Sequence, residues 1–230
     1  MSTWAGTSIV RVTSKSTFIN TLTNYFKNGS FPDKIKVSIE TKYLKSTEGL
    51  GRKGHRVRPM NGGVNYEFID SPGLSDTRGG QQDEINMTKI LDAVSNPPSL
   101  CAIIIISGKD SRNVLTLRNA VTRLQGSIPD VVLQNLVIVF TKCRADNRNF
   151  DQKSLGNLQT KSIFYMENSA FSTDPANWTK GATTFLKPEF NQSMHTVEKL
   201  LGNIQKKAGV ATQAFADMKS MRFKIKQTVS

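Results

Sequence analysis

The sequence of 230 residues is poor in cysteine and histidine, with two of each. Cys101 and Cys143 both lie in or beside strongly apolar segments, so we expect reduced thiols in the core rather than a disulfide framework. The histidines, His55 and His195, are scattered along the chain, and no ligand spacing typical of a structural zinc site is present. A small protein held together by disulfides and one held together by structural zinc are therefore both excluded.

Long hydrophobic runs are also missing. The longest apolar stretch, residues 100–106, has the length of a strand and falls short of the roughly 18–20 apolar residues of a membrane-spanning helix. The first residues lack the basic start and apolar stretch of a signal peptide. We therefore expect a cytoplasmic protein that reaches a membrane at most peripherally.

Acidic residues are few. The chain has 18 Asp and Glu against 31 Lys and Arg, which gives a formal net charge of +13. This charge attracts polyanions such as nucleotides, nucleic acid or anionic lipid, without selecting among them. The chain has no RNA-recognition signature, no zinc-finger spacing and no basic run with interleaved aromatic residues, so we do not expect nucleic-acid binding to be its main function.

The chain does contain an alternation of strand and helix patterns. Hydrophobic spacing predicts helices at 14–28, 83–95, 111–124, 190–207 and 210–228, with Ile85 and Met221 among the residues on their apolar faces. Apolar runs predict strands near 7–12 and at 34–44, 64–69, 100–107, 135–141 and 162–167, the last three buried on both faces. Residues 45–63, rich in Gly and basic side chains, are predicted to form a loop.

Strands that alternate with helices favour an α/β fold with a mostly parallel central sheet and helices on both faces. Such sheets bind ligands at the carboxyl ends of their strands. Asp70-Ser-Pro-Gly73 follows one predicted strand there. Asp70 is placed to hold Mg²⁺, and Gly73 lets a backbone N–H approach a terminal phosphate. An ordinary strand-ending turn is the alternative, because Asp, Ser, Pro and Gly are common turn residues.

The longer segment 66–86 reads Tyr-Glu-Phe-Ile-Asp-Ser-Pro-Gly-Leu-Ser-Asp-Thr-Arg-Gly-Gly-Gln-Gln-Asp-Glu-Ile-Asn. It resembles the magnesium-and-switch segment of septin-like P-loop GTPases, and more narrowly of their immunity-associated (paraseptin) branch. The resemblance implies a three-layer, G-domain-like P-loop NTPase fold that binds GTP or GDP with Mg²⁺ and pairs as a homodimer across the nucleotide face. Leu74 stands where Ras-type proteins have the Gln that orients the attacking water, which implies slow hydrolysis or hydrolysis completed by a partner.

The run Ser14-Lys15-Ser16-Thr17 is similar to the phosphate-binding run that opens the first helix of this family. The resemblance implies that Lys15 reaches the phosphates and that Ser16 holds Mg²⁺ together with Asp70. A Walker A loop reads G-x-x-x-x-G-K-[ST], whereas residues 9–16 read Ile-Val-Arg-Val-Thr-Ser-Lys-Ser and lack both glycines. Because those glycines let the loop curl around a phosphate, a helix start with no phosphate role is the alternative.

The strand predicted at 135–141 ends in Thr141-Lys142-Cys143-Arg144, where GTPases have an N/T-K-x-D motif. The resemblance implies that Thr141 and Lys142 hold the base. Arg144, however, replaces the Asp whose carboxylate accepts two N–H bonds from guanine, and arginine has only donors. Asp146, two residues further on, is the alternative acceptor.

Two further positions complete the implied site. Ser169 and Ala170 resemble the G-domain segment whose backbone contacts the guanine carbonyl. Switch I requires a loop Thr that senses the γ-phosphate, and Thr47 is the preferred candidate, with Thr41 as the alternative. No catalytic residue is assigned, and we leave open whether the chain is a GTP-hydrolysing enzyme.

We expect a G-domain-like unit at 1–207 and a helical extension at 208–230. The expected function is a guanine-nucleotide-binding switch with weak or lost GTP hydrolysis. The alternative is a pseudo-GTPase that serves as a protein-interaction module. The extension carries basic residues beside an apolar stripe, which predicts either contact with an anionic membrane surface or acidic protein, or a helix packed on the domain with a solvated basic face.

Overall fold

Six strands form one sheet in the order β2-β3-β1-β5-β6-β7. They are β1 (Gly6–Arg11), β2 (His55–Val57), β3 (Asn65–Asp70), β5 (Ala102–Gly108), β6 (Leu136–Thr141) and β7 (Ile163–Met166). Neighbouring strands are parallel except for β2, which pairs antiparallel with β3 at the edge. The structure is a computed structural model and describes residues 6–11, 16–48, 55–57, 65–70, 80–95, 97–108, 111–144, 150–155, 160 and 162–229.

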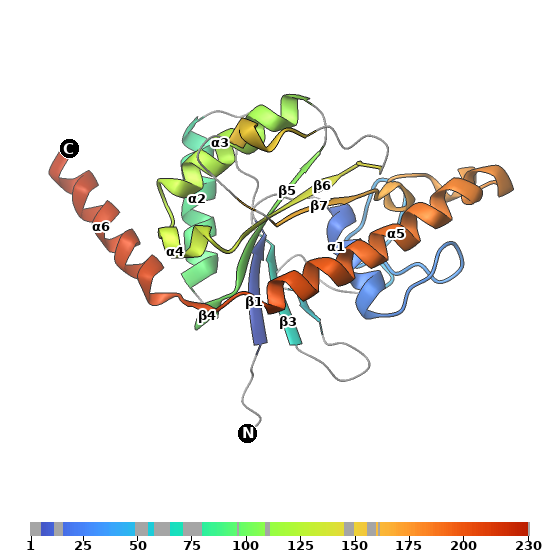
Figure 1. Ribbon diagram of the computed structural model, residues 1–230, viewed down its shortest axis with the longest axis horizontal. Coiled ribbons are helices and arrows are strands. Elements are labelled where there is room, and N and C mark those ends of the chain that lie inside the picture. The colour runs from blue at the N-terminus through green and yellow to red at the C-terminus, as the bar shows by residue number, and fades with distance from the viewer. Residues whose placement is uncertain are drawn as a thin grey trace, which may run out of the picture.

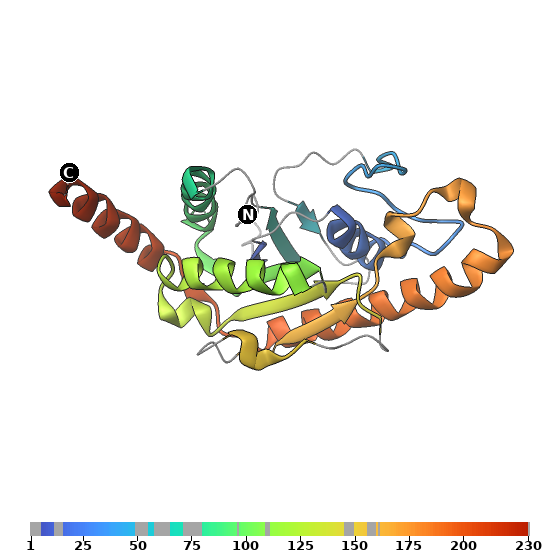
Figure 2. The ribbon, with the colours of Figure 1, turned by 90° about the horizontal axis from the view of Figure 1, so that it is seen from above.

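Helices cover both faces of this sheet, as Figures 1 and 2 show from two directions. On one face lie α1 (Ser16–Phe26) and α5 (Lys180–Gln205). On the other lie α2 (Gly80–Ser95), α3 (Ser111–Gln125) and the short α4 (Asp130–Leu133). The three-layer α/β architecture predicted from the alternation of strands and helices is therefore confirmed.

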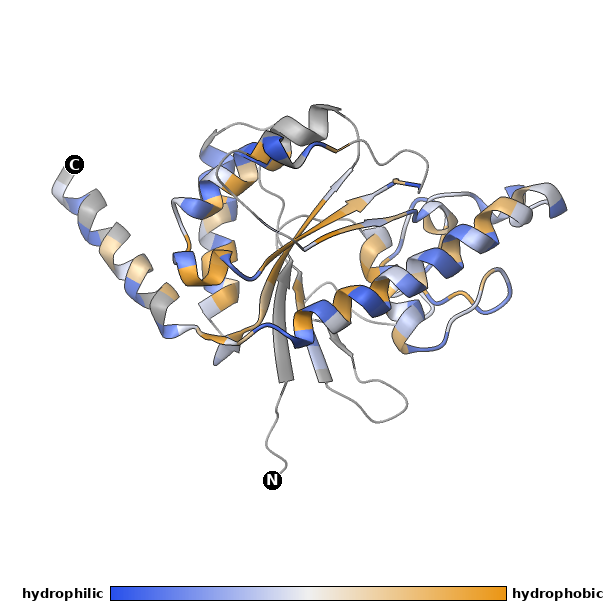
Figure 3. Cartoon of the chain, viewed as in Figure 1, coloured by the Kyte–Doolittle hydropathy of each residue, from blue (hydrophilic) through white to orange (hydrophobic). Residues whose placement is uncertain are grey.

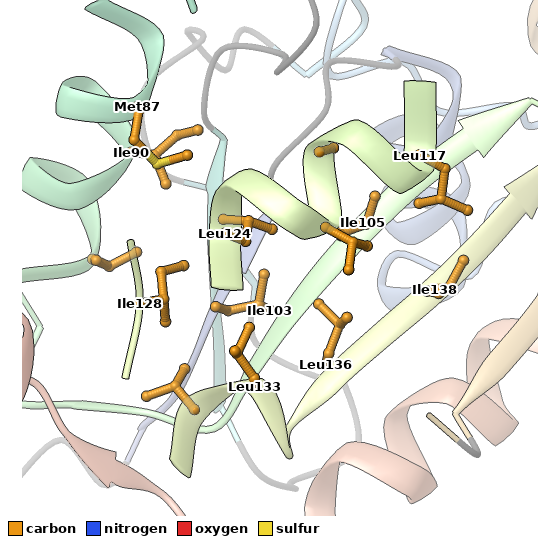
Figure 4. Packing of buried hydrophobic residues seen from close by; sticks show 14 of the residues in the cluster. Met87, Ile90, Ile103, Ile105, Leu117, Leu124, Ile128, Leu133, Leu136 and Ile138 are labelled. Atoms are coloured by element: carbon orange, nitrogen blue, oxygen red, sulfur yellow. The ribbon is translucent and has the colours of Figure 1, made fainter. Parts of the chain in front are cut away.

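The two central strands separate two hydrophobic cores. Every residue of β5 and β6 is buried, as expected for strands covered on both faces. Because successive side chains point to opposite faces, Ile103 and Ile105 join the core under α2 and α3, whereas Ile104 joins the core under α1 and α5. Figure 4 shows the core under α2 and α3. Figure 3 shows the apolar central strands between helices that have an apolar and a polar side.

The C-terminal segment packs against the body of the protein where it begins. The short strand β8 (Val210–Ala211) pairs antiparallel with β4 (Ser99–Leu100), and the Thr212 hydroxyl donates to the Pro97 carbonyl over 2.6 Å. Phe215, in the first turn of α6 (Gln213–Val229), is fully buried in the α2/α3 core. The rest of α6 leads away from the body of the protein (Figures 1 and 2).

Among the described residues, none of the helices is long and apolar enough to cross a membrane.

The strand predicted at 34–44 is wrong. Those residues are all described, and they follow α1 as an irregular segment whose only bridge joins Lys34 to Ser30. The backbone of this segment forms hydrogen bonds with the side chains of Asn20 and Asn24, one turn apart on α1, and not with a neighbouring strand. Asn24 pairs with the backbone N–H and C=O of Lys36, at 2.9 and 2.7 Å. The antiparallel edge strand is instead β2, inside the predicted loop 45–63.

Other sequence expectations also need correction. Ile85 of α2 is 46% exposed and Met221 of α6 is 63% exposed, so neither lies on a buried face. Strand β7 is only half-buried because it forms the sheet edge. Helix α5 begins at Lys180, ten residues before the predicted start, and continues through Pro188. Its N-terminal half packs in a third hydrophobic cluster around Phe31, Phe171 and Phe190.

Candidate functional site

The start of α1 lies at the carboxyl edge of the sheet. Arg11 ends β1 and pairs in register with Asp70, the last residue of β3. Only residues 12–15 separate Arg11 from Ser16, the first residue of α1. The pairing therefore places the end of β3 within a few residues of the N-terminus of a helix, where the helix dipole favours an anion.

Ile9 shows how the chain differs from a Walker A loop. It holds the place of the first Walker glycine, yet it is a paired residue of β1, in register with Phe68 on one side and Ala102 on the other. An ordinary strand conformation needs no glycine. The strand thus continues two residues past this position, and the connection to α1 is short.

A chain of hydrogen bonds joins the first turns of α1 to the end of β7. The Asn168 amide donates to Thr21 Oγ over 2.5 Å, and that hydroxyl donates to the Thr17 carbonyl over 2.8 Å. Asn168 and Thr21 are both buried. The predicted phosphate-binding helix and the predicted base-contacting segment are therefore held together at one edge of the sheet.

The carboxyl end of β6 has an unusual backbone. Thr141 is buried, and its hydroxyl donates to the Ser107 carbonyl of β5 over 3.3 Å. Lys142 then adopts φ of 55°, a left-handed conformation that costs a non-glycine residue about 1–2 kcal/mol. The Cys143 N–H donates to the Met166 carbonyl of β7, which fixes the turn above the next strand. Strained backbone of this kind clusters at ligand sites.

Ser169 and Ala170 begin the 3₁₀ turn η3 (Ser169–Phe171), which follows β7 after Glu167 and Asn168. The Ser169 hydroxyl donates to Glu167 Oε1 over 2.6 Å, and the Glu167 carbonyl accepts from the Ser193 hydroxyl of α5. Ala170 is buried against the third cluster. The end of β7 is thereby fixed between α1 and α5.

Arg144 points to α5. Its Nε lies 2.6 Å from Oε1 of Glu189, and the two side chains are 53% and 18% exposed. The residue in the place of the expected base-reading Asp thus makes an ion pair that ties the β6 loop to α5. The sequence gives no sign of this pair, because the two residues are far apart in the chain.

Thr47 lies along the second half of α1, away from Ser16. Its hydroxyl accepts from the Val37 N–H over 2.9 Å. The adjacent Glu48 pairs with Lys27, just past the end of α1, and this hydrogen bond holds the pKa of the Glu48 carboxyl below its usual value. Thr41, the alternative, accepts from the Leu44 N–H in a local turn. In this structure neither hydroxyl is brought to the start of α1.

Several predicted site residues lie outside the described residues. These are Ser14, Lys15, Gly73 and Asp146, together with the side chain of Asp70. Within the described part of the chain, no three His, Cys, Asp or Glu side chains gather as a metal site. Asn168 and Glu167, which sequence reasoning did not select, could have been found as polar residues directly after an apolar strand.

No protein-family model matches the chain, and no curated protein matches it. Solved structures do resemble it. A structure of the chloroplast translocon components atToc33 and psToc159, for whose GTPase activity dimerization is important, has a TM-score of 0.50 at 10% identity and covers 88% of this chain and 84% of its own. Toc33 from Arabidopsis thaliana in complex with GDP and Mg²⁺ has a TM-score of 0.46 at 11% identity, covering 90% and 88%.

A GTP-binding protein from the hyperthermophilic archaeon Sulfolobus solfataricus in complex with GDP has a TM-score of 0.42 at 14% identity, covering 83% of this chain and 53% of its own. The chain spans 56% of the length of two variants of the protein SsGBP. At these identities the likeness concerns the fold alone. The chain has the α/β P-loop fold of G domains, with the strand order described above.

Proposed function

We propose that this protein is a guanine-nucleotide-binding switch of the septin-like group with weak or lost GTP hydrolysis. One observation carries the proposal. In a G-domain fold, the start of α1, the strained end of β6 and the end of β7 lie at one carboxyl edge, and the hydrogen bonds from Asn168 through Thr21 to Thr17 join α1 to the end of β7. The septin-like assignment rests on the resemblance of segment 66–86.

Each end of this edge has a role in the proposal. Lys15 and the first backbone N–H groups of α1 bind the phosphates, and Gly73 senses the γ-phosphate. Thr141, Lys142, Ser169 and Ala170 hold the base end. Ser16 and Asp70 fit Mg²⁺ because both offer hard oxygen donors. The β1–β3 register supports this assignment, because it sets Asp70 opposite Arg11, five residues before Ser16. When bound, Mg²⁺ neutralises charge on the phosphates.

Slow hydrolysis follows from Leu74, which has no polar group to orient a water molecule. In this proposal, a second copy of the chain pairs across the nucleotide face and supplies the polar group that Leu74 lacks. Whether the chain hydrolyses GTP by itself can be read directly from phosphate release by the purified protein.

A pseudo-GTPase that acts as an interaction module is the second candidate. It is favoured by Ile9, which extends β1 where a Walker A loop begins, and by Arg144, which is tied to α5. Such a protein would keep the fold and bind partners through surfaces next to the unused site. The two candidates differ in one property, the binding of nucleotide.

The Lys15→Ala variant tests the switch proposal. A ligand that binds only the native state at about 100 times its Kd stabilises a protein by roughly 2.7 kcal/mol. We expect a non-hydrolysable GTP analogue with Mg²⁺ to raise the Tm of the wild-type protein by several degrees, and Lys15→Ala to weaken binding about a hundredfold and remove the shift. The measurement is thermal unfolding with and without analogue.

The matched control is Lys199→Ala, which removes one positive charge from an exposed position on α5. This variant should retain the full shift in Tm. Equal loss in both variants would show that only net charge matters, and no shift in the wild-type protein would favour the pseudo-GTPase.

A further inference from the structure

Segment 37–48 is a closed loop whose two ends are bonded to each other. The Thr47 N–H donates to the Val37 carbonyl over 2.8 Å, and the Val37 N–H donates back to Thr47 Oγ1 over 2.9 Å. The Glu48 N–H also donates to the Val37 carbonyl, over 3.3 Å. Surface loops whose ends meet in this way are compact and are frequently functional.

The carboxylate of Glu48 ties this loop to α1. The side chain is only 10% exposed, and its two oxygens pair with two lysines, Oε2 with Lys27, just past the end of α1, and Oε1 with Lys36 over 3.8 Å. The Thr47 hydroxyl donates to Oε1 as well, over 3.3 Å. A carboxylate that is largely shielded from water is screened less than a surface charge, so these contacts hold the loop more firmly than an exposed pair would.

The contacts of Glu48 hold Thr47 away from the carboxyl edge of the sheet. Helix α1 begins at that edge with Ser16, and Lys27 lies eleven residues further on, about 16 Å along the helix axis. The backbone of Lys36 is bonded to Asn24, in the last turn of α1. The closed loop therefore does not make the contact with a γ-phosphate that the sequence predicts for Thr47.

The chain on either side of Thr47 is nevertheless anchored near the carboxyl edge. On one side, Asn20 bonds the backbone of Ile39 at a point four residues, or about 6 Å, from the first residue of α1. On the other side, His55 begins β2 and pairs with Phe68, two residues before the end of β3. Thr47 is eight residues from Ile39 and eight from His55, and eight residues span up to about 26 Å. Thr47 can thus reach the edge while both anchors stay in place.

We propose that the contacts of Glu48 with Lys27 and Lys36 are an autoinhibitory latch, and that its release lets the Thr47 hydroxyl reach the γ-phosphate of a bound nucleoside triphosphate. This inference rests on the proposed function, because it assigns a regulation to the same site. A nucleoside diphosphate has no γ-phosphate and gains nothing from release. The latch therefore weakens the binding of the triphosphate alone, in proportion to the fraction of molecules in which the loop is closed.

Glu48→Gln tests the latch, because it removes the charge and keeps the size of the side chain. Calorimetry with Mg²⁺ gives the Kd values of GDP and of a non-hydrolysable GTP analogue for the wild-type protein and the variant. We expect the variant to bind the GTP analogue about five- to tenfold more tightly, and GDP within about twofold of the wild-type value. The gain should disappear in Glu48→Gln/Thr47→Val, which lacks the hydroxyl and keeps the volume of Thr47.

Glu40→Gln is the matched control, because Glu40 is an exposed acid on the same loop and its substitution changes the net charge equally. It should leave both Kd values unchanged. Lys27→Met breaks the latch from the side of α1, so it should reproduce the gain, and it carries the test if Glu48→Gln does not fold.

Hydrogen exchange without nucleotide examines the latch itself. The amides of Thr47 and Glu48, which donate to Val37, should exchange about tenfold faster in Glu48→Gln than in Glu40→Gln, because the loop opens more often. Equal exchange in the two variants would overturn the proposal, since the loop would then be closed without help from the carboxylate.

The binding measurements separate the remaining outcomes. A gain of the same size in Glu40→Gln would show that only net charge matters and would overturn the latch. An unchanged ratio of the two Kd values in Glu48→Gln, or a gain that persists without the Thr47 hydroxyl, would overturn it and leave nucleotide binding in place. Absence of binding by any nucleotide would overturn the proposed function, and this inference with it.

Discussion

Asn20→Ala is expected to lower the free energy of unfolding by about 3–5 kcal/mol, because each buried backbone group left without a partner costs roughly 1–3 kcal/mol. Asn20 is fully buried on α1. Its Oδ1 accepts from the N–H groups of Ser38 and Ile39, each at 2.9 Å, and its Nδ2 donates to the Ile39 carbonyl over 2.8 Å. The higher helix propensity of alanine returns only about 0.5 kcal/mol.

Urea unfolding of the variant measures this loss as a lower midpoint at an unchanged slope. Asn191→Ala is the control, because Asn191 is exposed on α5 and should change stability by less than about 0.5 kcal/mol. A loss in Asn20→Ala no larger than in this control would mean that segment 34–44 is not held by α1.

Phe215→Ala is the second large effect. Truncating a fully buried Phe in a packed core typically costs about 3–5 kcal/mol, from lost burial and the cavity left behind. Phe215 is fully buried in the α2/α3 core, whereas Met221, on the same helix, is 63% exposed. We therefore expect Phe215→Ala to lower the unfolding free energy by that amount and Met221→Ala to have little effect, both measured in urea.

The comparison also bears on the predicted division into a domain at 1–207 and an extension at 208–230. If Phe215→Ala destabilises the whole protein in one transition, the start of the extension belongs to the folding unit of the domain. Equal and small losses in the two variants would instead indicate an extension that folds apart from the core.

The two central strands of the sheet could be predicted from the sequence because their burial is continuous. Residues 102–106 of β5 and 136–140 of β6 are apolar at every position, a pattern typical of a strand covered on both faces. Segment 34–44 shows the limit of the same reasoning. Its alternating Ile35, Val37 and Ile39 fit a strand, but the partner that decides its conformation is Asn20, which no local pattern reveals.

Part of the candidate site could likewise be predicted from the sequence, and part could not. The resemblance to GTPases selected Thr141, Lys142 and Ser169, and the strands do bring these residues to one edge. The link from Asn168 to Thr21 and the pair between Arg144 and Glu189 join residues distant in sequence, so they emerge only from the packing of α1 and α5 on the sheet. Sequence reasoning identified the loss of the acceptor at position 144 but not what Arg144 does instead.

Nucleotide binding is the central claim, and calorimetric titration of nucleotide-stripped protein with a non-hydrolysable GTP analogue and Mg²⁺ tests it most directly. We predict saturable binding with a Kd in the micromolar range, near one nucleotide per chain, that is lost in Lys15→Ala. No heat at millimolar nucleotide, from a protein that unfolds cooperatively and is therefore folded, would contradict the claim and leave a G-domain fold used for interaction alone.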